Sequence, residues 1–289
     1  FSALLDTPEA GVFQLAPDLP DARRQQLYLP DTNVLQTRWL DEQAVVECTD
    51  LMPINADVDA APRLIRTIRV VSGSATIRLR CRVRHDYSRA DTVAEIDGGD
   101  VLFHAPGQPS LRLSASQPLR IDEQCAIAEF ELCEGEHAQF VLGAMDDPLV
   151  AAGACEHCLQ ETLKYWRRWI KQSNYRGRWR EMVHRSALAL KLLTSRKHGG
   201  IIAAATYGLP EAAGGERNWD YRYTWIRDAS FTVYAFMRLG FSEEANAFMR
   251  WVRDRVDDCS ETPAHLRILY SLRGQHHFCL LYTSDAADE

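Results

Sequence analysis

The sequence has no apolar run of the ~18 residues that a membrane-spanning helix needs. It also has no excess of basic residues, because 33 Lys and Arg stand against 40 Asp and Glu, which gives a formal net charge of −7. No signal peptide is recognised at the first residues, although the sequence begins with Phe1 and not with Met. We therefore expect a cytoplasmic protein that has no membrane partner and no nucleic-acid partner.

The eight cysteines do not have the spacing of a metal site. Only Cys155 and Cys158 stand close together, as C-E-H-C, and a zinc site would need a second pair at a matching distance. A redox pair of the thioredoxin type would lie between a strand and a helix, which is not the context of this pair. We therefore expect ordinary thiols in a reducing compartment, with no metal and no cofactor.

Residues 1–147 contain many short runs in which apolar and polar residues alternate, as is typical of β-strands. Turn signals such as Ser72–Gly73 and Gly98–Gly99 separate the runs. Many short strands at this spacing predict an antiparallel β-sandwich. Arginines alternate with aliphatic residues over 64–71 and 75–84. We interpret them as the solvated face of two paired strands, in preference to an anion-binding or polysaccharide-binding patch.

After residue 147 the apolar period becomes helical. Residues 148–177 predict a linker helix with a basic, tryptophan-rich end, K-Y-W-R-R-W-I-K, which we expect to dock one domain onto the other. Apolar stripes predict further helices over 178–195, 229–239 and 242–257. The segment 229–239 is apolar on most sides, so we expect this helix to be buried on most sides.

Aromatic and polar side chains are concentrated in the stretch N-W-D-Y-R-Y-T-W-I-R-D, residues 218–228. The alternating aromatics are Trp219, Tyr221, Tyr223 and Trp225. Strict alternation predicts an extended backbone with the rings on one face. Such rings can stack on the C–H patches of a pyranose, and nearby Arg and Asp can bind its hydroxyls through charge-assisted hydrogen bonds. From spacing alone, a half-buried edge strand with a salt-bridged Arg and Asp is an equal alternative.

The run G-L-P-E-A-A-G-G-E-R-N-W-D-Y-R-Y-T-W-I-R-D-A (208–229) resembles the signature of the bacterial glucoamylase-like and trehalase-like enzymes of glycoside hydrolase family 15. The segment R-S-A-L-A-L-K-L-L (185–193) fits the same family. The opening F-S-A-L-L-D is similar to the start of the trehalase-like N-terminal domain that these enzymes carry. The resemblance covers residues 1–277.

The resemblance implies an α+β multidomain fold. An N-terminal antiparallel β-sandwich (1–147) and the linker helix (148–177) would precede the first helices of an (α/α)6 barrel (178–277). The tail 278–289 has no family resemblance and reads like translated sequencing-adapter sequence. We therefore expect a C-terminally truncated fragment.

The resemblance also implies an inverting, exo-acting hydrolase whose substrate is an α-glucoside, with maltodextrin, isomaltose-type sugars and trehalose left open. Tyr221 would face the sugar near its reacting carbon, and Trp225 would line the pocket. Arg227 and Asp228 would hold the hydroxyls of the non-reducing-end glucose. The implied supporting residues are Trp219, Asp220 and Arg222.

Inversion requires a carboxylic acid and a carboxylate base that lie roughly 6.5–9.5 Å apart. The resemblance places both on glutamates of later barrel segments, so no residue of this sequence is assigned as acid or base. A carbohydrate-binding chain without catalysis is one alternative. Another is a chain that exposes apolar helix faces and aggregates. For Arg227 and Asp228, the alternative is a structural ion pair at a helix start.

Overall fold

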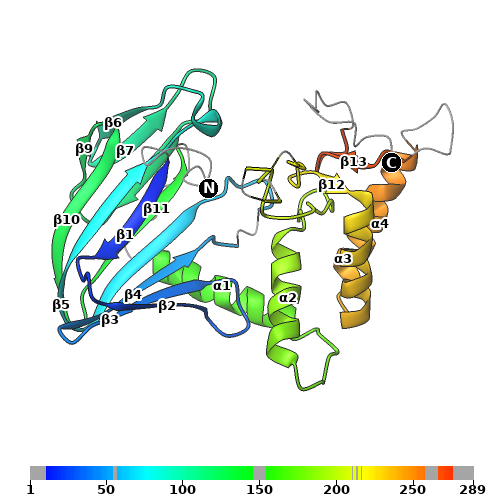
Figure 1. The fold of residues 1–289 in the computed structure, drawn as a ribbon, viewed down its shortest axis with the longest axis horizontal. Coiled ribbons are helices and arrows are strands. Elements are labelled where there is room, and N and C mark those ends of the chain that lie inside the picture. Colours follow the sequence, from blue (N-terminus) through cyan, green and yellow to red (C-terminus); the bar gives the residue numbers. More distant parts are fainter. Residues whose placement is uncertain are drawn as a thin grey trace. The chain divides into compact units, whose positions relative to one another are not determined.

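The computed structural model describes residues 11–54, 57–145, 154–209, 211–212, 214–215, 217–257 and 266–275. These residues divide into two compact units, the first ending at Arg168 and the second beginning at Trp169. Antiparallel strands build the first unit and helices dominate the second (Figure 1). The expected α+β class is therefore confirmed, whereas the (α/α)6 barrel stays a prediction. The domain boundaries at residues 147 and 177 also stay predictions.

The first unit consists of antiparallel strands in two sheets that share one strand. The strands are β1 (Val12–Pro17), β2 (Arg23–Tyr28), β3 (Leu35–Leu40), β4 (Ala44–Leu51), β5 (Leu64–Arg82), β6 (Val93–Asp97), β7 (Asp100–His104), β8 (Leu111–Ala115), β9 (Arg120–Asp122), β10 (Cys125–Cys133) and β11 (His137–Ala144). One sheet has the order β2-β3-β4-β5-β11-β8-β7-β6, and β5 also pairs with β1 and with β10, which continues to β9. All of these pairs are antiparallel, as predicted.

Strand β5 is the shared strand and is 19 residues long. Residues 64–73 pair with β4 and β11, whereas residues 74–82 pair with β1 and β10. The transition lies at Gly73, whose φ of 78° is in the region that favours glycine. A Cβ at this position would lie 2.0 Å from the carbonyl oxygen of Gln43, so a larger residue does not fit. The kink at Gly73 therefore passes the chain from one sheet into the other.

The prediction of two separate strands, over 64–71 and 75–84, is wrong at this point. Ser72–Gly73 reads as a turn in sequence, because Gly after Ser is a common turn signal. In the structure the register to β4 shifts just before Gly73, and the strand bends without reversing. A local irregularity of this kind increases strand bending and twist. The arginines therefore follow one long strand and not two paired ones.

Apolar side chains from both sheets fill a common core. Ile77 and Leu79 from the second part of β5 belong to the same cluster as Val46, Phe103 and Phe140 of the other sheet. All five side chains are almost completely buried. The two sheets thus enclose one hydrophobic core, which is the arrangement that the alternating pattern predicts.

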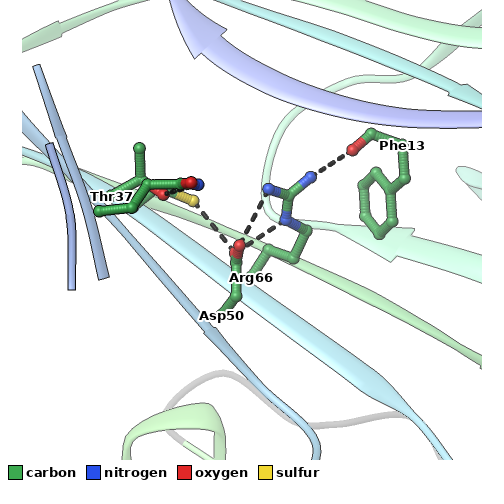
Figure 2. A network of polar contacts seen from close by, with 6 residues as sticks. Phe13, Thr37, Asp50 and Arg66 are labelled. Atoms are coloured by element: carbon green, nitrogen blue, oxygen red, sulfur yellow. Dashed lines mark hydrogen bonds and ion pairs between the residues drawn. The ribbon is translucent and has the colours of Figure 1, made fainter. Parts of the chain in front are cut away.

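The charged side chain of Arg66 is mostly buried and contacts Asp50 and Phe13 (Figure 2). Its Nε and Nη2 bind the two carboxylate oxygens of Asp50 at 2.8 and 3.1 Å, and its Nη1 donates to the carbonyl oxygen of Phe13. The guanidinium carbon also lies 4.9 Å from the centroid of the Phe13 ring. Because Phe13 belongs to β1 and Asp50 to β4, this contact ties the two sheets together.

Other arginines of β5 are neutralised by carboxylates on neighbouring strands. Arg69 Nη2 lies 2.8 Å from Glu47 of β4, and Arg78 Nε lies 3.1 Å from Glu129 of β10. These ion pairs favour the interpretation of the arginines as a solvated, charge-balanced face over that of an anion-binding patch.

Helix α1 (Ala154–Ile170) follows the strands, and residues 148–153 of the predicted linker helix lie outside the described residues. Within the first unit, Cys155 and Leu163 pack on a small cluster with Leu51 and Ile65. Burial, and then the neighbouring Cys158, raise the pKa of Cys155, which disfavours the reactive thiolate.

The second unit contains α2 (Arg180–Leu192), α3 (Ile226–Leu239) and α4 (Ser242–Asp257). The three predicted helices are therefore present, with ends that differ by a few residues. Helix α3 ends at Gly240, which has a φ of 94° and accommodates the left-handed cap. Within the described residues, no helix has the length and apolar character that a bilayer crossing requires.

The expectation that α3 is buried on most sides is wrong. Ala229, Val233 and Phe236 are its buried residues. Phe231, Tyr234 and Met237 are 71%, 64% and 64% exposed. Their spacing of three residues gives one exposed apolar stripe along the helix. The helix is apolar on most sides, but its contacts with α4, α2 and Trp169 at the end of α1 involve its buried side, and the stripe of Phe231, Tyr234 and Met237 stays exposed.

A buried polar contact joins the helices of this unit. Trp169 stacks on Phe241 with ring centroids 4.1 Å apart, and its Nε1 donates to Glu244 Oε1 at 2.6 Å. The same carboxylate oxygen accepts a hydrogen bond from Lys191 Nζ at 2.7 Å. The side chains of Lys191 and Glu244 are only 13% and 5% exposed. The end of α1, the end of α2 and the start of α4 are therefore held by one charged group.

Candidate functional site

Residues 218–228 do not form one extended strand. Tyr221 and Arg222 lie in a turn, and only β12 (Thr224–Trp225) is extended, paired with β13 (Leu269–Tyr270). The prediction of extended structure over the whole stretch is therefore wrong. The chain turns here because Asp220 Oδ1 accepts a hydrogen bond from the backbone N of Arg222 at 3.0 Å. An aspartate that binds the backbone two residues ahead stabilises a turn against the alternating pattern.

The loop before this stretch folds back along it through backbone hydrogen bonds. The bonded pairs, donor first, are Ala203–Tyr223 (3.1 Å), Ala204–Tyr221 (3.2 Å), Tyr221–Tyr207 (2.9 Å) and Glu211–Arg217 (3.3 Å). These bonds satisfy backbone groups that a loop would otherwise leave to solvent. They also bring residues near 211 beside the aromatic residues of the stretch.

Three aromatic rings gather at the turn. The centroids of Trp219 and Trp225 lie 6.2 Å apart with an interplanar angle of 86°, and those of Tyr221 and Trp225 lie 6.3 Å apart at 51°. These are the edge-to-face and tilted geometries that aromatic pairs prefer. We call Trp219, Tyr221 and Trp225 the ring cluster. Its members are partly exposed, so their surfaces remain accessible.

Asp220 and Arg222 form an ion pair within the turn. Arg222 Nε donates to Asp220 Oδ1 at 2.9 Å, and Arg222 Nη2 donates to Oδ2 at 2.5 Å. Burial by itself would raise the pKa of Asp220, but the hydrogen bonds and charge of Arg222 outweigh it and lower that pKa. The backbone carbonyl of Asp220 accepts a hydrogen bond from Trp225 Nε1 at 2.9 Å. The turn therefore sets the orientation of the Trp225 indole.

Arg227 and Asp228 lie in the first turn of α3. Arg227 Nε is 3.8 Å from Asp228 Oδ2, and the two side chains are 81% and 37% exposed. This separation is longer than a hydrogen bond. The Oδ2 atom of Asp228 is itself buried, yet it has no hydrogen-bond partner among the described residues. The pair thus leaves polar atoms available for a ligand, although the loose contact is also compatible with a structural ion pair at the helix start.

Tyr221 links the ring cluster to these charged residues. Its pKa is raised by burial first, then by the negative charges of Glu211 and Asp228, while the charge of Arg227 lowers it. The phenol therefore lies within electrostatic reach of all three groups. Of the four residues that the sequence predicts for sugar binding, Tyr221 and Trp225 are in ring contact, and Arg227 and Asp228 are neighbours in the first turn of α3, which directly follows Trp225.

Glu211 also reaches this site, although its sequence context predicts no role for it. Trp219 Nε1 donates to Glu211 Oε1 at 3.0 Å. Glu211 stands seven residues before the aromatic stretch, between glycines, where no periodicity indicates which way its side chain points. The signal that places it is the fold-back of the loop, and that becomes visible only in the structure.

The chain is similar to known proteins over most of its length. The profile described as "Trehalase-like, N-terminal" matches residues 1–139, and the profile of "Glycosyl hydrolases family 15" matches residues 177–278. The chain is 32% identical to a trehalase of Mycolicibacterium smegmatis, covering 95% of this chain and 45% of that relative. It is 31% identical to a trehalase of Mycobacterium tuberculosis (95% and 44%) and 31% identical to one of Thermoplasma volcanium (94% and 44%). The chain therefore spans less than half the length of these curated relatives.

Proposed function

Because the profiles of the family 15 glycosyl hydrolases and of the trehalase-like N-terminal region both match this chain, we propose that it belongs to this family and forms part of an α-glucoside hydrolase. Trehalose is the first substrate to test, since the relatives that match are trehalases. Maltodextrin and isomaltose-type sugars are the competing substrates. The reaction is proposed to be exo-acting and to invert the configuration of the anomeric carbon.

The site around the ring cluster is proposed to bind one terminal glucose. Tyr221 and Trp225 would present ring surface to the C–H face of the sugar. Arg227 and Asp228 would bind hydroxyls at its non-reducing end, and charged partners make such contacts strong and directional. A sugar held by its terminal hydroxyls is positioned for removal of one residue at a time, which supports the exo-acting mode.

The observation that carries this proposal is the buried Oδ2 of Asp228. A buried acceptor without a hydrogen bond costs about 1–3 kcal/mol, and more when it is charged. A hydroxyl donated by a ligand would remove this cost. The exposed guanidinium of Arg227 beside it, together with the ring cluster, matches the mixture of charged and aromatic groups that sugar recognition needs.

The acid and the base of the reaction are not assigned to residues of this chain. Inversion needs two carboxyl groups roughly 6.5–9.5 Å apart, with room for a water molecule between them. The proposal places these two glutamates in segments of the relatives that lie beyond the 45% share matched here. The described site would then supply substrate binding, and later segments would supply proton transfer.

Helices α2, α3 and α4 are proposed to be the first helices of an (α/α)6 barrel over residues 178–277. The exposed stripe of Phe231, Tyr234 and Met237 supports this proposal. An apolar helix face of this size is normally covered by another helix in a folded protein. The corresponding domain proposal is a β-sandwich over 1–147 and a linker helix over 148–177.

The first test measures the binding of sugars to the 289-residue chain. Trehalose, maltose and methyl α-glucoside are titrated while tryptophan fluorescence is recorded, because Trp219 and Trp225 belong to the ring cluster. Asp228→Asn and Arg227→Gln should abolish the response and leave the unfolding temperature unchanged. Variants that bind these sugars as tightly as the wild type would overturn the assignment of the site.

Catalysis is tested in a protein of the full length of the relatives. The loss of both charged contacts should lower kcat/KM for trehalose roughly 30-fold to several thousand-fold, because such contacts contribute about 2–5 kcal/mol. NMR of the first product should show β-glucose if the reaction inverts. Sugar binding without any release of glucose would favour a non-catalytic carbohydrate-binding protein.

A further inference from the structure

Glu211 approaches the ring cluster from the loop that folds back along it. Its Oε1 accepts a hydrogen bond from Trp219 Nε1 at 3.0 Å. The Trp219 ring in turn meets Trp225 edge to face, with centroids 6.2 Å apart. Glu211 is itself fixed at its backbone, where its N donates to the carbonyl of Arg217 at 3.3 Å. One carboxylate therefore holds the outer tryptophan of the cluster in place.

The other carboxylate oxygen of Glu211 remains available. Glu211 is exposed, and its Oε2 receives no hydrogen bond from the part of the chain that the structure describes. The charge of Glu211 acts on the phenol of Tyr221, as does that of Asp228. Glu211 and Asp228 belong to two different segments, a loop and the start of α3.

We propose that Glu211 is a positioning and specificity-determining residue, which orients Trp219 through Oε1 and accepts a hydroxyl of the bound α-glucoside through Oε2. The inference rests on the proposed sugar site and adds a contact from the loop. A carboxylate fixed by one oxygen loses little freedom when the other binds, so the contact is preorganised. A site that bonds a particular hydroxyl also discriminates strongly against sugars that lack it.

Two variants separate the two roles. In Glu211→Gln the amide oxygen can still accept the Trp219 indole hydrogen, but an NH2 group replaces the second acceptor. In Glu211→Ala both acceptors are lost. Glu134→Gln is the matched control, because it removes the same charge from an exposed position in the first unit.

The wild-type chain and each variant are titrated with methyl α-glucoside and its monodeoxy analogues. We expect the wild type to bind one deoxy analogue about tenfold more weakly than the parent sugar, as for the loss of a charge-assisted hydrogen bond. Glu211→Gln should bind the parent sugar about tenfold more weakly and should no longer distinguish that analogue from it. Glu134→Gln should behave as the wild type does.

The indole N–H signals in NMR spectra provide a readout that does not need sugar. The Trp219 signal, assigned through its loss in Trp219→Phe, should move strongly in Glu211→Ala and little in Glu211→Gln. If Glu211→Gln weakened the binding of all the sugars by one common factor, or weakened the binding of none, the proposed hydroxyl contact would be overturned. If the Trp219 signal stayed in place in Glu211→Ala, the positioning role would be overturned.

Failure of the proposed sugar site gives a different result. In that case the wild-type chain binds none of these sugars, and the hydroxyl contact of Glu211 falls with the site. Movement of the Trp219 signal in Glu211→Ala would then support the positioning role alone.

Discussion

Trp225 donates its indole hydrogen to the backbone carbonyl of Asp220, with 2.9 Å between the two heavy atoms. The side chain of Asp220 holds the same turn through Arg222, so the carboxylate controls the orientation of the indole indirectly. We predict that Asp220→Ala weakens sugar binding by a factor that corresponds to about 1–3 kcal/mol, because a charge-assisted contact is lost. A sugar titration followed by tryptophan fluorescence measures this loss of binding affinity. Unaltered binding in this variant would contradict the supporting role of the turn.

The contribution of the Asp220–Arg222 contact should also depend on pH. Arg222 lowers the pKa of Asp220 below its ordinary value of 3.8, against the opposing effect of burial. Because the folded-state pKa is the lower one, the stabilisation is complete above 3.8 and declines as the pH falls through the folded-state pKa. The unfolding free energies of the wild type and of Asp220→Asn should therefore differ at neutral pH and converge in acid. A difference that stays constant into strong acid would argue against the ion pair.

Glu244 should be the most sensitive charged residue of the second unit. Its removal in Glu244→Ala leaves Lys191 buried without its partner, which costs about 3–5 kcal/mol in comparable pairs. Lys191→Met combined with Glu244→Leu should recover only part of that loss, because apolar replacement of a buried ion pair is often neutral but the hydrogen bond from Trp169 Nε1 to Glu244 is still lost. Denaturant unfolding followed by tryptophan fluorescence gives the free energies. The prediction fails if Glu244→Ala unfolds at the same denaturant concentration as the wild type.

Gly73→Ala should destabilise the first unit far more than Gly135→Ala. Both glycines have positive φ values, 78° and 84°, so both variants lose about 1–2 kcal/mol from backbone strain. At Gly73 the new methyl group would additionally meet the Gln43 carbonyl oxygen at 2.0 Å, whereas nothing lies within 4 Å at Gly135. We expect a further cost of about 1–3 kcal/mol from this overlap. Equal unfolding midpoints for the two variants would show that the backbone near the Gln43 carbonyl moves away from the new methyl group without a cost in free energy.

The exposed stripe of α3 should bind hydrophobic dyes. Replacing Phe231, Tyr234 and Met237 by serine should reduce dye fluorescence and self-association, because an exposed apolar patch is removed. The helix should remain, since its buried face is unchanged, and circular dichroism checks this. Met52→Ser, at another exposed apolar residue in the first unit, is the control. If the triple variant bound as much dye as the wild type, the stripe would not be the surface that binds the dye.

Periodicity predicted the helices well, because it reports burial of one face. Helix α4 begins at Ser242, and α3 ends at Leu239, where the left-handed cap residue Gly240 places the boundary. The apolar residues of α3 predicted a helix that is buried on most sides, which is wrong. An apolar pattern shows which residues avoid water but not whether a neighbouring element is present to cover them. The exposed side chain of Phe231 illustrates this difference.

The failures at the turn and in β5 share a cause. Local alternation predicted an extended segment through Tyr221, but the hydrogen bond from Arg222 N to Asp220 bends the chain. At Ser72–Gly73 the local signal predicted a reversal, but pairing on both sides keeps the strand running. In each case a specific hydrogen bond or a long-range pairing outweighs a weak local preference. The sequence does not predict the position of Glu211 for a related reason, since only the backbone hydrogen bonds of the folded loop bring it to Trp219.

Strand β5 has a further consequence for how the first unit comes apart. Since residues 64–73 are hydrogen-bonded in one sheet and residues 74–82 in the other, full opening of either sheet would disrupt part of the same strand. Amide hydrogens along the whole length of β5 should exchange with deuterated solvent only when the entire unit unfolds, at one common rate.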